Sequence, residues 1–128
     1  MSGRVTTHVL DLSRGVPAAG MVIQLWKLGK DRAGELLRAA VTNSDGRLDA
    51  PLLAGAELIP GSYELLFMAG DYFRAAHAAA GGAEEHAAGA GGMFLEAIPL
   101  RFNVNNPAEH YHVPLLVAPG GYSTYRGS

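Results

Sequence analysis

The sequence predicts an all-β fold: a β-sandwich of seven to eight short strands with one short α-helix. Strand-like segments recur along the chain, turn residues such as Asp45-Gly46 and Asn105-Asn106-Pro107 separate them, and one alanine-rich stretch near Tyr72–Ala80 favours a helix. The chain has 128 residues, so we expect a single domain over positions 1–128. A chain of that length buries enough apolar surface to be stable without disulfides.

The N-terminal segment from Arg4 to Leu12 alternates in the manner of a half-buried strand. Its apolar face carries two valines, so His8 lies on the opposite face. The next apolar segment, Met21 to Leu28, is nearly continuous, which is typical of a strand buried on both faces. We therefore expect its tryptophan, Trp26, in the core.

A third strand is predicted over Glu35 to Thr42, and the residues Asn43-Ser44-Asp45-Gly46 follow it. Asp-Gly adopts the positive φ of a tight turn readily, so these four residues predict a sharp corner. Arg47 comes immediately after this turn. Its position is therefore expected to be set by a rigid corner and not by a loose loop.

The second half of the chain contains the helix and the remaining strands. After a looser segment from Leu48 to Leu58, Asp71 is expected to cap a helix over Tyr72–Ala80. Residues 81–92 are low in complexity and rich in Ala and Gly, which predicts a flexible loop. The remaining strands are predicted over Gly61–Met68, Phe94–Val104, His110–Val117 and Tyr122–Tyr125. Pro114 lacks a backbone donor, so its strand should have a free side or a bulge there.

Composition excludes several classes of partner. Ten Lys and Arg against twelve Asp and Glu give a net charge of −2, without a basic block that would favour nucleic acid or an anionic membrane. There are no cysteines, no long apolar run and no signal-peptide pattern, so we expect a soluble, cytoplasmic protein. Its partner is then a small molecule or another copy of itself.

The C-terminal segment is unusually rich in chemical groups for a chain end, with two histidines, three tyrosines and an arginine after position 109. His110 and His112 are two residues apart on a strand and therefore share a face. With His8 they could form a zinc site with one open position. In the alternative, His110 is an exposed turn residue and only His112 faces inward. His77 and His86 are assigned no role.

Other polar side chains also have two interpretations. The planar donors of Arg47 suit a flat imide or ureide, although an arginine after a turn is often a surface charge. Tyr125 could donate to a developing oxyanion, or pack as an interface aromatic. Ser123, Thr124 and Ser128 could be nucleophiles beside His112, but the G-x-S-x-G pattern of a nucleophile elbow does not surround them.

Several motifs resemble the 5-hydroxyisourate hydrolases of the transthyretin-related family, and the resemblance spans essentially the whole chain. They are Thr6-Thr7-His8-Val9-Leu10-Asp11, Gly15-x-Pro17-Ala18, Thr42-Asn43-x-Asp45-Gly46-Arg47, His110-Tyr111-His112-Val113-Pro114-Leu115-Leu116 and the terminal Tyr125-Arg126-Gly127-Ser128. The terminal tetrapeptide distinguishes the hydrolases from the hormone-carrying transthyretins. The stretched Ala/Gly tract departs from the family pattern.

The resemblance implies a transthyretin-like (prealbumin-like) sandwich and a homotetramer, a dimer of dimers whose channel holds the active sites. It implies hydrolysis of 5-hydroxyisourate to 2-oxo-4-hydroxy-4-carboxy-5-ureidoimidazoline in urate degradation, with neither cofactor nor metal. The implied catalytic residues are His8, Arg47, His112 and Ser128, and the implied substrate-binding residues are His8, Arg47 and Tyr125. Two alternatives stay open: a transthyretin-like carrier that binds a small molecule without catalysis, and a three-histidine zinc hydrolase. The sequence does not decide whether His8 or His112 is the general base.

Overall fold

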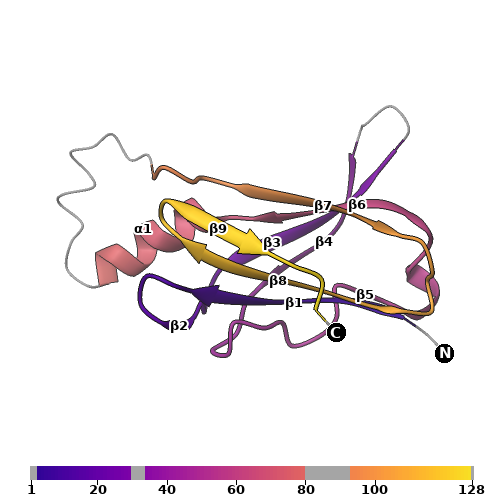
Figure 1. Cartoon of the computed structure of the whole chain (residues 1–128), viewed down its shortest axis with the longest axis horizontal. Coiled ribbons are helices and arrows are strands. Elements are labelled where there is room, and N and C mark those ends of the chain that lie inside the picture. The colour runs from indigo at the N-terminus through magenta and orange to yellow at the C-terminus, as the bar shows by residue number, and fades with distance from the viewer. Residues whose placement is uncertain (1–2, 30–33, 80–92, 128) are drawn as a thin grey trace.

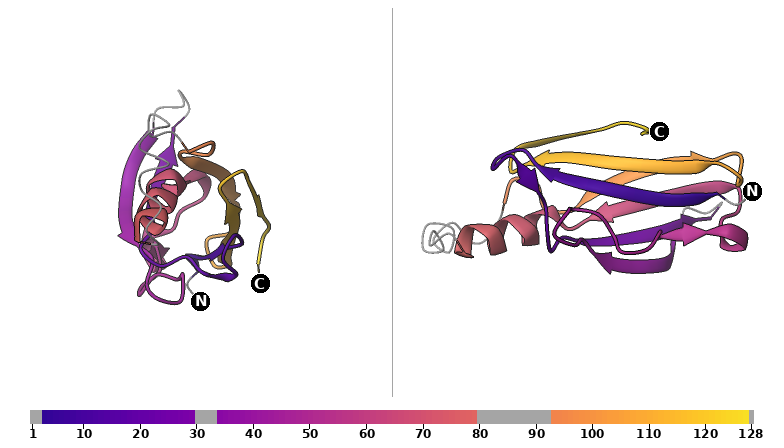
Figure 2. Two further views of the ribbon diagram at one scale, coloured as in Figure 1. Left: turned by 90° about the vertical axis from the view of Figure 1, so that its left-hand side faces the viewer. Right: turned by 90° about the horizontal axis from the view of Figure 1, so that it is seen from below.

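The computed structural model describes residues 3–29, 34–79 and 93–127. The chain forms two β-sheets stacked face to face, with one helix at an end of the stack (Figures 1 and 2). The predicted all-β class, a β-sandwich with one short helix, is confirmed within these residues. The predicted loop over 81–92 lies outside the described residues, as do His86 and Ser128.

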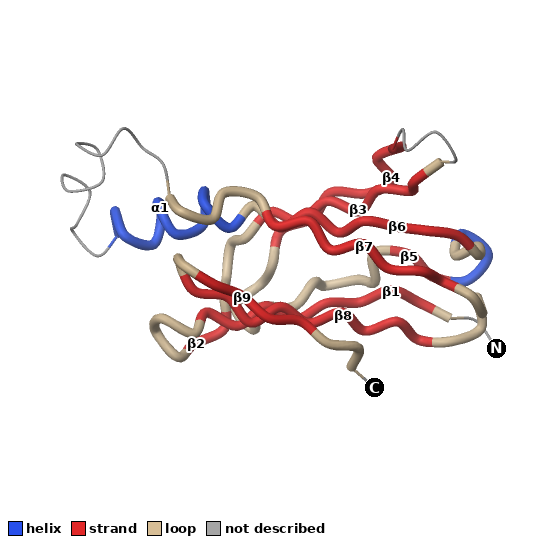
Figure 3. Tube along the Cα trace, turned by 45° about the horizontal axis from the view of Figure 1, so that its top comes forward, coloured by secondary structure: helices blue, strands red, loops and turns tan. Residues whose placement is uncertain are grey.

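The site lies on the first sheet. That sheet has the strand order β2-β1-β8-β9, with β5 also pairing to β1. Its strands are β1 (Arg4–Asp11), β2 (Val16–Pro17), β5 (Leu53–Ala54), β8 (His110–Ala118) and β9 (Gly121–Thr124). The second sheet has the order β4-β3-β6-β7, and Figure 3 shows it as the other layer. Its strands are β3 (Val22–Leu28), β4 (Gly34–Val41), β6 (Gly61–Phe67) and β7 (Ile98–Val104), and a 3-10 turn, η1, spans Gly55–Glu57.

The core fills the space between the two sheets, and alternation along β1 shows how the sequence builds it. The odd-numbered residues of β1, from Val5 to Asp11, are buried, whereas Thr6, His8 and Leu10 are half-buried on the outer face. This confirms the predicted placement of His8 opposite the valines. The largest fully buried side chains are Tyr63, Phe67, Met21, Ile23 and Leu25.

The prediction for the second apolar segment is wrong. Strand β3 alternates between buried and more accessible residues, and Trp26 is half-buried on its outer face instead of lying in the core. The indole N–H of Trp26 donates to Oε1 of Gln24 at 2.9 Å. The two residues share that face because they are two positions apart. The sheet is antiparallel and this chain covers only its inner face, so a run of apolar residues does not require burial on both sides.

The helix and the strand after it also differ from expectation. Helix α1 spans Ala69–Ala79, so Asp71 lies inside its first turn and is not its N-cap. The backbone N–H of Gly70 donates instead to the carbonyl oxygen of Glu96 at 2.7 Å, which satisfies one donor of the first turn. The segment before β7 is thereby held against the helix, and β7 begins at Ile98 rather than at Phe94. In the described part of the chain, no helix is long and apolar enough to cross a membrane.

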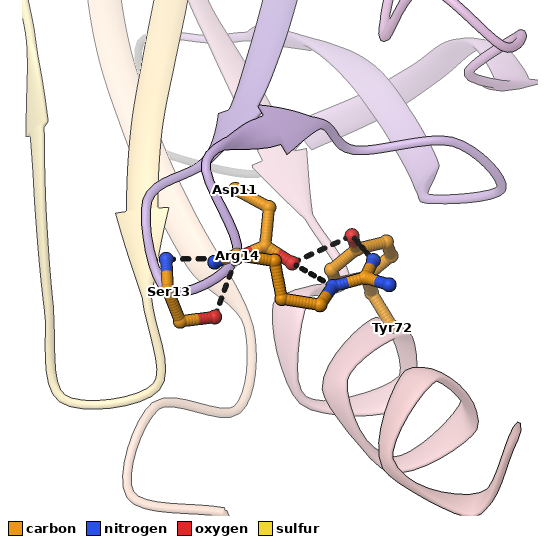
Figure 4. Close-up of polar contacts among 4 residues, drawn as sticks. All are labelled: Asp11, Ser13, Arg14 and Tyr72. Carbon is orange, nitrogen blue, oxygen red and sulfur yellow. Dashed lines mark hydrogen bonds and ion pairs between the residues drawn. The ribbon is translucent and has the colours of Figure 1, made fainter. Parts of the chain in front are cut away.

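A buried carboxylate joins α1 to the first sheet. The side chain of Asp11, at the end of β1, has no solvent exposure. Its oxygens accept from the Ser13 backbone N–H (3.0 Å), from Nε of Arg14 (3.0 Å) and from the hydroxyl of Tyr72 in α1 (2.8 Å), as Figure 4 shows. Burial alone would raise the pKa of Asp11, but hydrogen bonds from the side chains of Ser13, Tyr72 and Arg14 outweigh it and keep the pKa below its ordinary value.

Replacing Asp11 with alanine is expected to lower the free energy of unfolding by about 1–3 kcal/mol, because the hydroxyl of the buried Tyr72 loses its acceptor and the turn after β1 loses its hydrogen bonds to the carboxylate. Chemical denaturation followed by circular dichroism measures this change. Asp71→Ala is the matched control: its carboxylate is 74% exposed, and its ion pair with Arg74 is solvated. Equal destabilisation by the two substitutions would contradict the structural role of Asp11.

Candidate active site

The pairing of β1 with β8 brings three histidines to one outer face. These strands run parallel, and their register places Arg4 beside His110, Thr6 beside His112 and His8 beside Pro114. All six positions are even-numbered, so their side chains share the face opposite the core. A segment near the N-terminus and one near the C-terminus, about a hundred residues apart, therefore build one surface.

The turn after β4 delivers Arg47 to the same surface. Gly46 has a φ of 74°, as predicted for the Asp-Gly corner, and its carbonyl oxygen accepts from the Val9 N–H at 2.8 Å. The side-chain oxygen of Asn43 accepts from the backbone N–H of Asp45 (2.9 Å) and of Arg47 (3.2 Å). Arg47 also forms an isolated β-bridge with His8. The backbone of Arg47 is thus fixed by hydrogen bonds on both sides, in accord with the predicted rigid corner.

The imidazole of His8 is oriented by the same turn. Its Nε2 lies 3.0 Å from the carbonyl oxygen of Asp45. A carbonyl oxygen only accepts, so Nε2 carries the proton and donates. In the neutral ring, Nδ1 of His8 is therefore the acceptor.

Thr6 lies between the other two histidines. Its hydroxyl oxygen is 2.6 Å from Nε2 of His110 and 2.8 Å from Nδ1 of His112. The two imidazole centroids are 5.9 Å apart. Sequence reasoning missed Thr6 and left His110 as either a zinc ligand or an exposed turn residue; His110 is in fact half-buried in β8.

The chain end runs alongside β8 beyond the last residue of β9. The backbone N–H of Gly127 donates to the carbonyl oxygen of His112 at 2.8 Å, and the two residues form an isolated bridge. This bridge continues the register in which Leu115 pairs with Thr124. The pairing is interrupted in between, opposite Pro114, which has no N–H to donate. The predicted free side of Pro114 is therefore observed.

Neighbouring residues of the chain end face different parts of the molecule. Tyr125 lines the cleft with the histidines. Arg126 does not: its Nη2 donates to Oε1 of Glu109 at 2.9 Å, and its guanidinium carbon is 4.5 Å from the ring centroid of Tyr111. Gly127 packs against His112, so that a Cβ at position 127 would lie 2.5 Å from Cδ2 of that ring.

Together these groups line a cleft of about 560 Å³ on the outer face of the first sheet. The predicted site residues His8, Arg47, His112 and Tyr125 all line it, and Ser128 lies outside the described residues. His77 is in α1 and not among the lining residues. The structure thus brings together four of the five predicted side chains, and adds Thr6 and His110.

The electrostatics of the cleft favour neutral imidazoles. The pKa of His112 is lowered by burial, and further by the nearby His110, Arg47 and His8. Burial and Arg47 lower the pKa of His8, against the opposing effect of the Asp45 carbonyl. Burial, Arg4 and Arg126 lower the pKa of His110. At neutral pH each ring is therefore an uncharged base, next to the permanent positive charge of Arg47.

The geometry gives no support to the three-histidine zinc alternative. Within the described ranges, no group of three or more His, Cys, Asp or Glu side chains is placed to hold a metal ion. Neutral bases and a guanidinium in one cleft suit proton abstraction from water beside a polarised carbonyl.

Comparison with known proteins shows similarity along nearly the whole chain. A model of the HIUase/Transthyretin family matches residues 5–127. A curated 5-hydroxyisourate hydrolase from Halalkalibacterium halodurans is 56% identical, with 100% of each chain covered. The solved 5-hydroxyisourate hydrolase of Klebsiella pneumoniae is 35% identical, with a TM-score of 0.74 and 100% of each chain covered. The solved (S)-allantoin synthase is 43% identical with a TM-score of 0.80, and the match covers 99% of this chain but 44% of that longer one. The chain therefore belongs to the HIUase/Transthyretin family.

Proposed function

We propose that this protein hydrolyses 5-hydroxyisourate to 2-oxo-4-hydroxy-4-carboxy-5-ureidoimidazoline, a step of urate degradation. The observation that carries the proposal is the convergence of His8, Arg47 and His112 on one cleft, in a chain whose relatives are named for this reaction. A carrier gains little from a cluster of titratable groups that it must desolvate when the ligand binds. The constellation therefore favours an enzyme over a binding protein.

In this proposal His112 is the general base. It takes a proton from water, the water oxygen attacks an amide carbonyl of the six-membered ring, and the ring C–N bond breaks as its nitrogen takes up a proton. His112 suits this role because Nδ1 is held by Thr6, which leaves Nε2 as the nitrogen available to water. Because its pKa is lowered, the ring stays neutral at physiological pH.

Arg47 and His8 bind and orient the substrate. The guanidinium of Arg47 donates to a substrate carbonyl and stabilises the negative charge that develops on its oxygen. Nδ1 of His8 accepts from a ring N–H, because Nε2 of this imidazole already donates to the Asp45 carbonyl. Tyr125 forms part of the polar wall of the cleft.

The proposed assembly is a homotetramer, a dimer of dimers that covers the cleft. The sheet face that carries the site is open in the single chain, and Tyr125 is 61% exposed. A second protomer over this face would exclude bulk water and strengthen the electrostatic interactions inside. Sedimentation equilibrium measures the mass; a monomer that hydrolyses the substrate at full rate would contradict this part of the proposal.

The decisive experiment generates 5-hydroxyisourate in place from urate with urate oxidase and follows its decay by absorbance, with and without this protein. We expect faster decay, with a rate proportional to protein concentration. A carrier would bind the substrate without accelerating its decay. Unchanged decay at micromolar protein would overturn the proposed function.

The packing of Gly127 on His112 gives a prediction about the chain end. Gly127→Ala is expected to lower kcat/KM by about 10-fold or more, because the added methyl displaces the His112 ring or the tail, and small displacements of catalytic groups slow reactions strongly. Gly120→Ala, in the β8–β9 turn, is the matched control, since a Cβ there meets nothing within 4 Å. Equal rates for the two variants would argue against a role for the tail in positioning His112.

A further inference from the structure

We propose that Thr6 and His110 are positioning residues that hold His112 in its Nδ1–H tautomer and so leave Nε2 free as the base. The inference rests on the proposed function and deepens it, since it names what makes His112 competent. The chain of hydrogen bonds runs from Nδ1–H of His112 to the Thr6 oxygen, and from the Thr6 hydroxyl to Nε2 of His110.

The first step is a count of protons. The Thr6 oxygen is within hydrogen-bond distance of two ring nitrogens, at 2.6 and 2.8 Å, but a hydroxyl has only one proton to donate. It must therefore donate to one histidine and accept from an N–H of the other. With both rings neutral, the two hydrogen bonds can both form in only two ways. In one, Thr6 donates to His112 and both rings are Nε2–H tautomers; in the other, Thr6 donates to His110 and both rings are Nδ1–H tautomers.

The second step identifies the competent arrangement. If Thr6 donates to His112, the proton of that ring sits on Nε2 and the ring cannot take a proton from water there. If Thr6 donates to His110, Nδ1 of His112 carries the proton and Nε2 has a free lone pair. The direction of the hydrogen bond at Nδ1 of His112 thus determines whether Nε2 carries a proton or can accept one. Only the second arrangement gives a general base.

The third step explains why a threonine and a second histidine are both needed. Neutral imidazole in water prefers the Nε2–H tautomer, which is the inactive one here. A hydroxyl alone can donate to Nδ1 of His112 and stabilise that inactive form. His110 offers the Thr6 hydroxyl a second acceptor, Nε2, and when Thr6 donates to it the Thr6 oxygen accepts from Nδ1–H of His112. The parallel register of β1 and β8 places Thr6 beside His112, with His110 one same-face position earlier in β8.

The test combines kinetics with nitrogen-15 NMR of the histidine rings. Thr6→Val keeps the shape of the side chain but removes the hydroxyl, and should lower kcat by about 10- to 100-fold, the usual effect of losing such a supporting partner. KM should change less than threefold, because Arg47 and His8 are untouched. The His112 signals should shift from the Nδ1–H to the Nε2–H tautomer. Thr6→Ser should restore both the rate and the tautomer.

Two further variants separate positioning from stability. Thr7→Val removes a neighbouring hydroxyl that donates to the Val113 carbonyl at 2.7 Å on the core side of the same strand. It should lower the melting temperature without changing the tautomer or kcat. His110→Phe removes the acceptor, so Thr6 then donates to His112, and kcat should fall at least as far as in Thr6→Val.

The outcomes distinguish this inference from the proposed function. A wild-type protein that does not accelerate the decay of 5-hydroxyisourate overturns the proposed function. An active wild type whose His112 is in the Nε2–H tautomer overturns the inference alone, and so does a Thr6→Val variant with kcat within twofold of wild type. If Thr6→Val does not fold, the wild-type tautomer and His110→Phe decide the question.

Discussion

Replacing Arg47 with alanine is expected to lower kcat/KM for 5-hydroxyisourate by about 100- to 1000-fold, the effect of removing one preorganised donor from a developing oxyanion. The guanidinium stands on a backbone fixed by Asn43 and by the bridge to His8, so the turn holds this residue at the cleft before substrate binds. Steady-state rates measured with freshly generated substrate test this expectation.

Two further substitutions show what Arg47 contributes. Arg47→Lys keeps the charge but loses the planar pair of donors, so it should recover only part of the rate if a flat carbonyl group is held by two parallel hydrogen bonds. Arg38→Ala is the matched control, since Arg38 lies on β4 in the other sheet and pairs with Glu57 at 3.2 Å. A comparable loss of rate in Arg38→Ala would indicate a general effect of lost charge and would contradict the assigned role.

The parts of this site that could be predicted from sequence are those controlled by local patterns. Alternation along β1 placed His8 on the outer face, and the Asp-Gly corner placed Arg47 at a rigid turn; both are dictated by a few neighbouring residues. Pro114 predicted an interruption of strand pairing, because proline has no backbone N–H to donate. The motif resemblance then indicated which of these polar residues act together.

The parts that could not be predicted depend on register and on distant contacts. The bridge from Thr6 to His110 and His112 exists only because β1 and β8 run parallel in one particular register, and a shift of one residue would turn the histidines toward the core. The start of α1 depends on a carbonyl of Glu96, far along the chain. Trp26 was misplaced because an apolar run does not reveal how many layers cover a sheet.

Replacing His112 with asparagine should have an effect as large as the loss of Arg47, and it should also change the pH profile. Removal of a general base lowers kcat by about 100- to 10,000-fold. Because the pKa of His112 is lowered by burial and by its positively charged or titratable neighbours, the wild-type rate should stay on its plateau below pH ~6.5, the ordinary histidine value, and fall only at lower pH as the ring becomes protonated. Rates between pH 4.5 and 8.5 measure this.

The fall in rate at low pH, which we call the acid limb of the pH profile, identifies the histidine that acts as the general base. If His112 is the base, His112→Asn loses the limb along with most of the rate, and the residual activity is nearly independent of pH. His77→Asn, in α1, should keep both the limb and the rate. His8 also has a lowered pKa, which Arg47 helps to lower, and its Nε2 is engaged with the Asp45 carbonyl while Nδ1 can accept a proton, so it is a rival for the role of base. A His112→Asn variant whose residual activity keeps the wild-type limb would transfer the role of base to Nδ1 of His8, and would make the Thr6 chain a support for substrate binding.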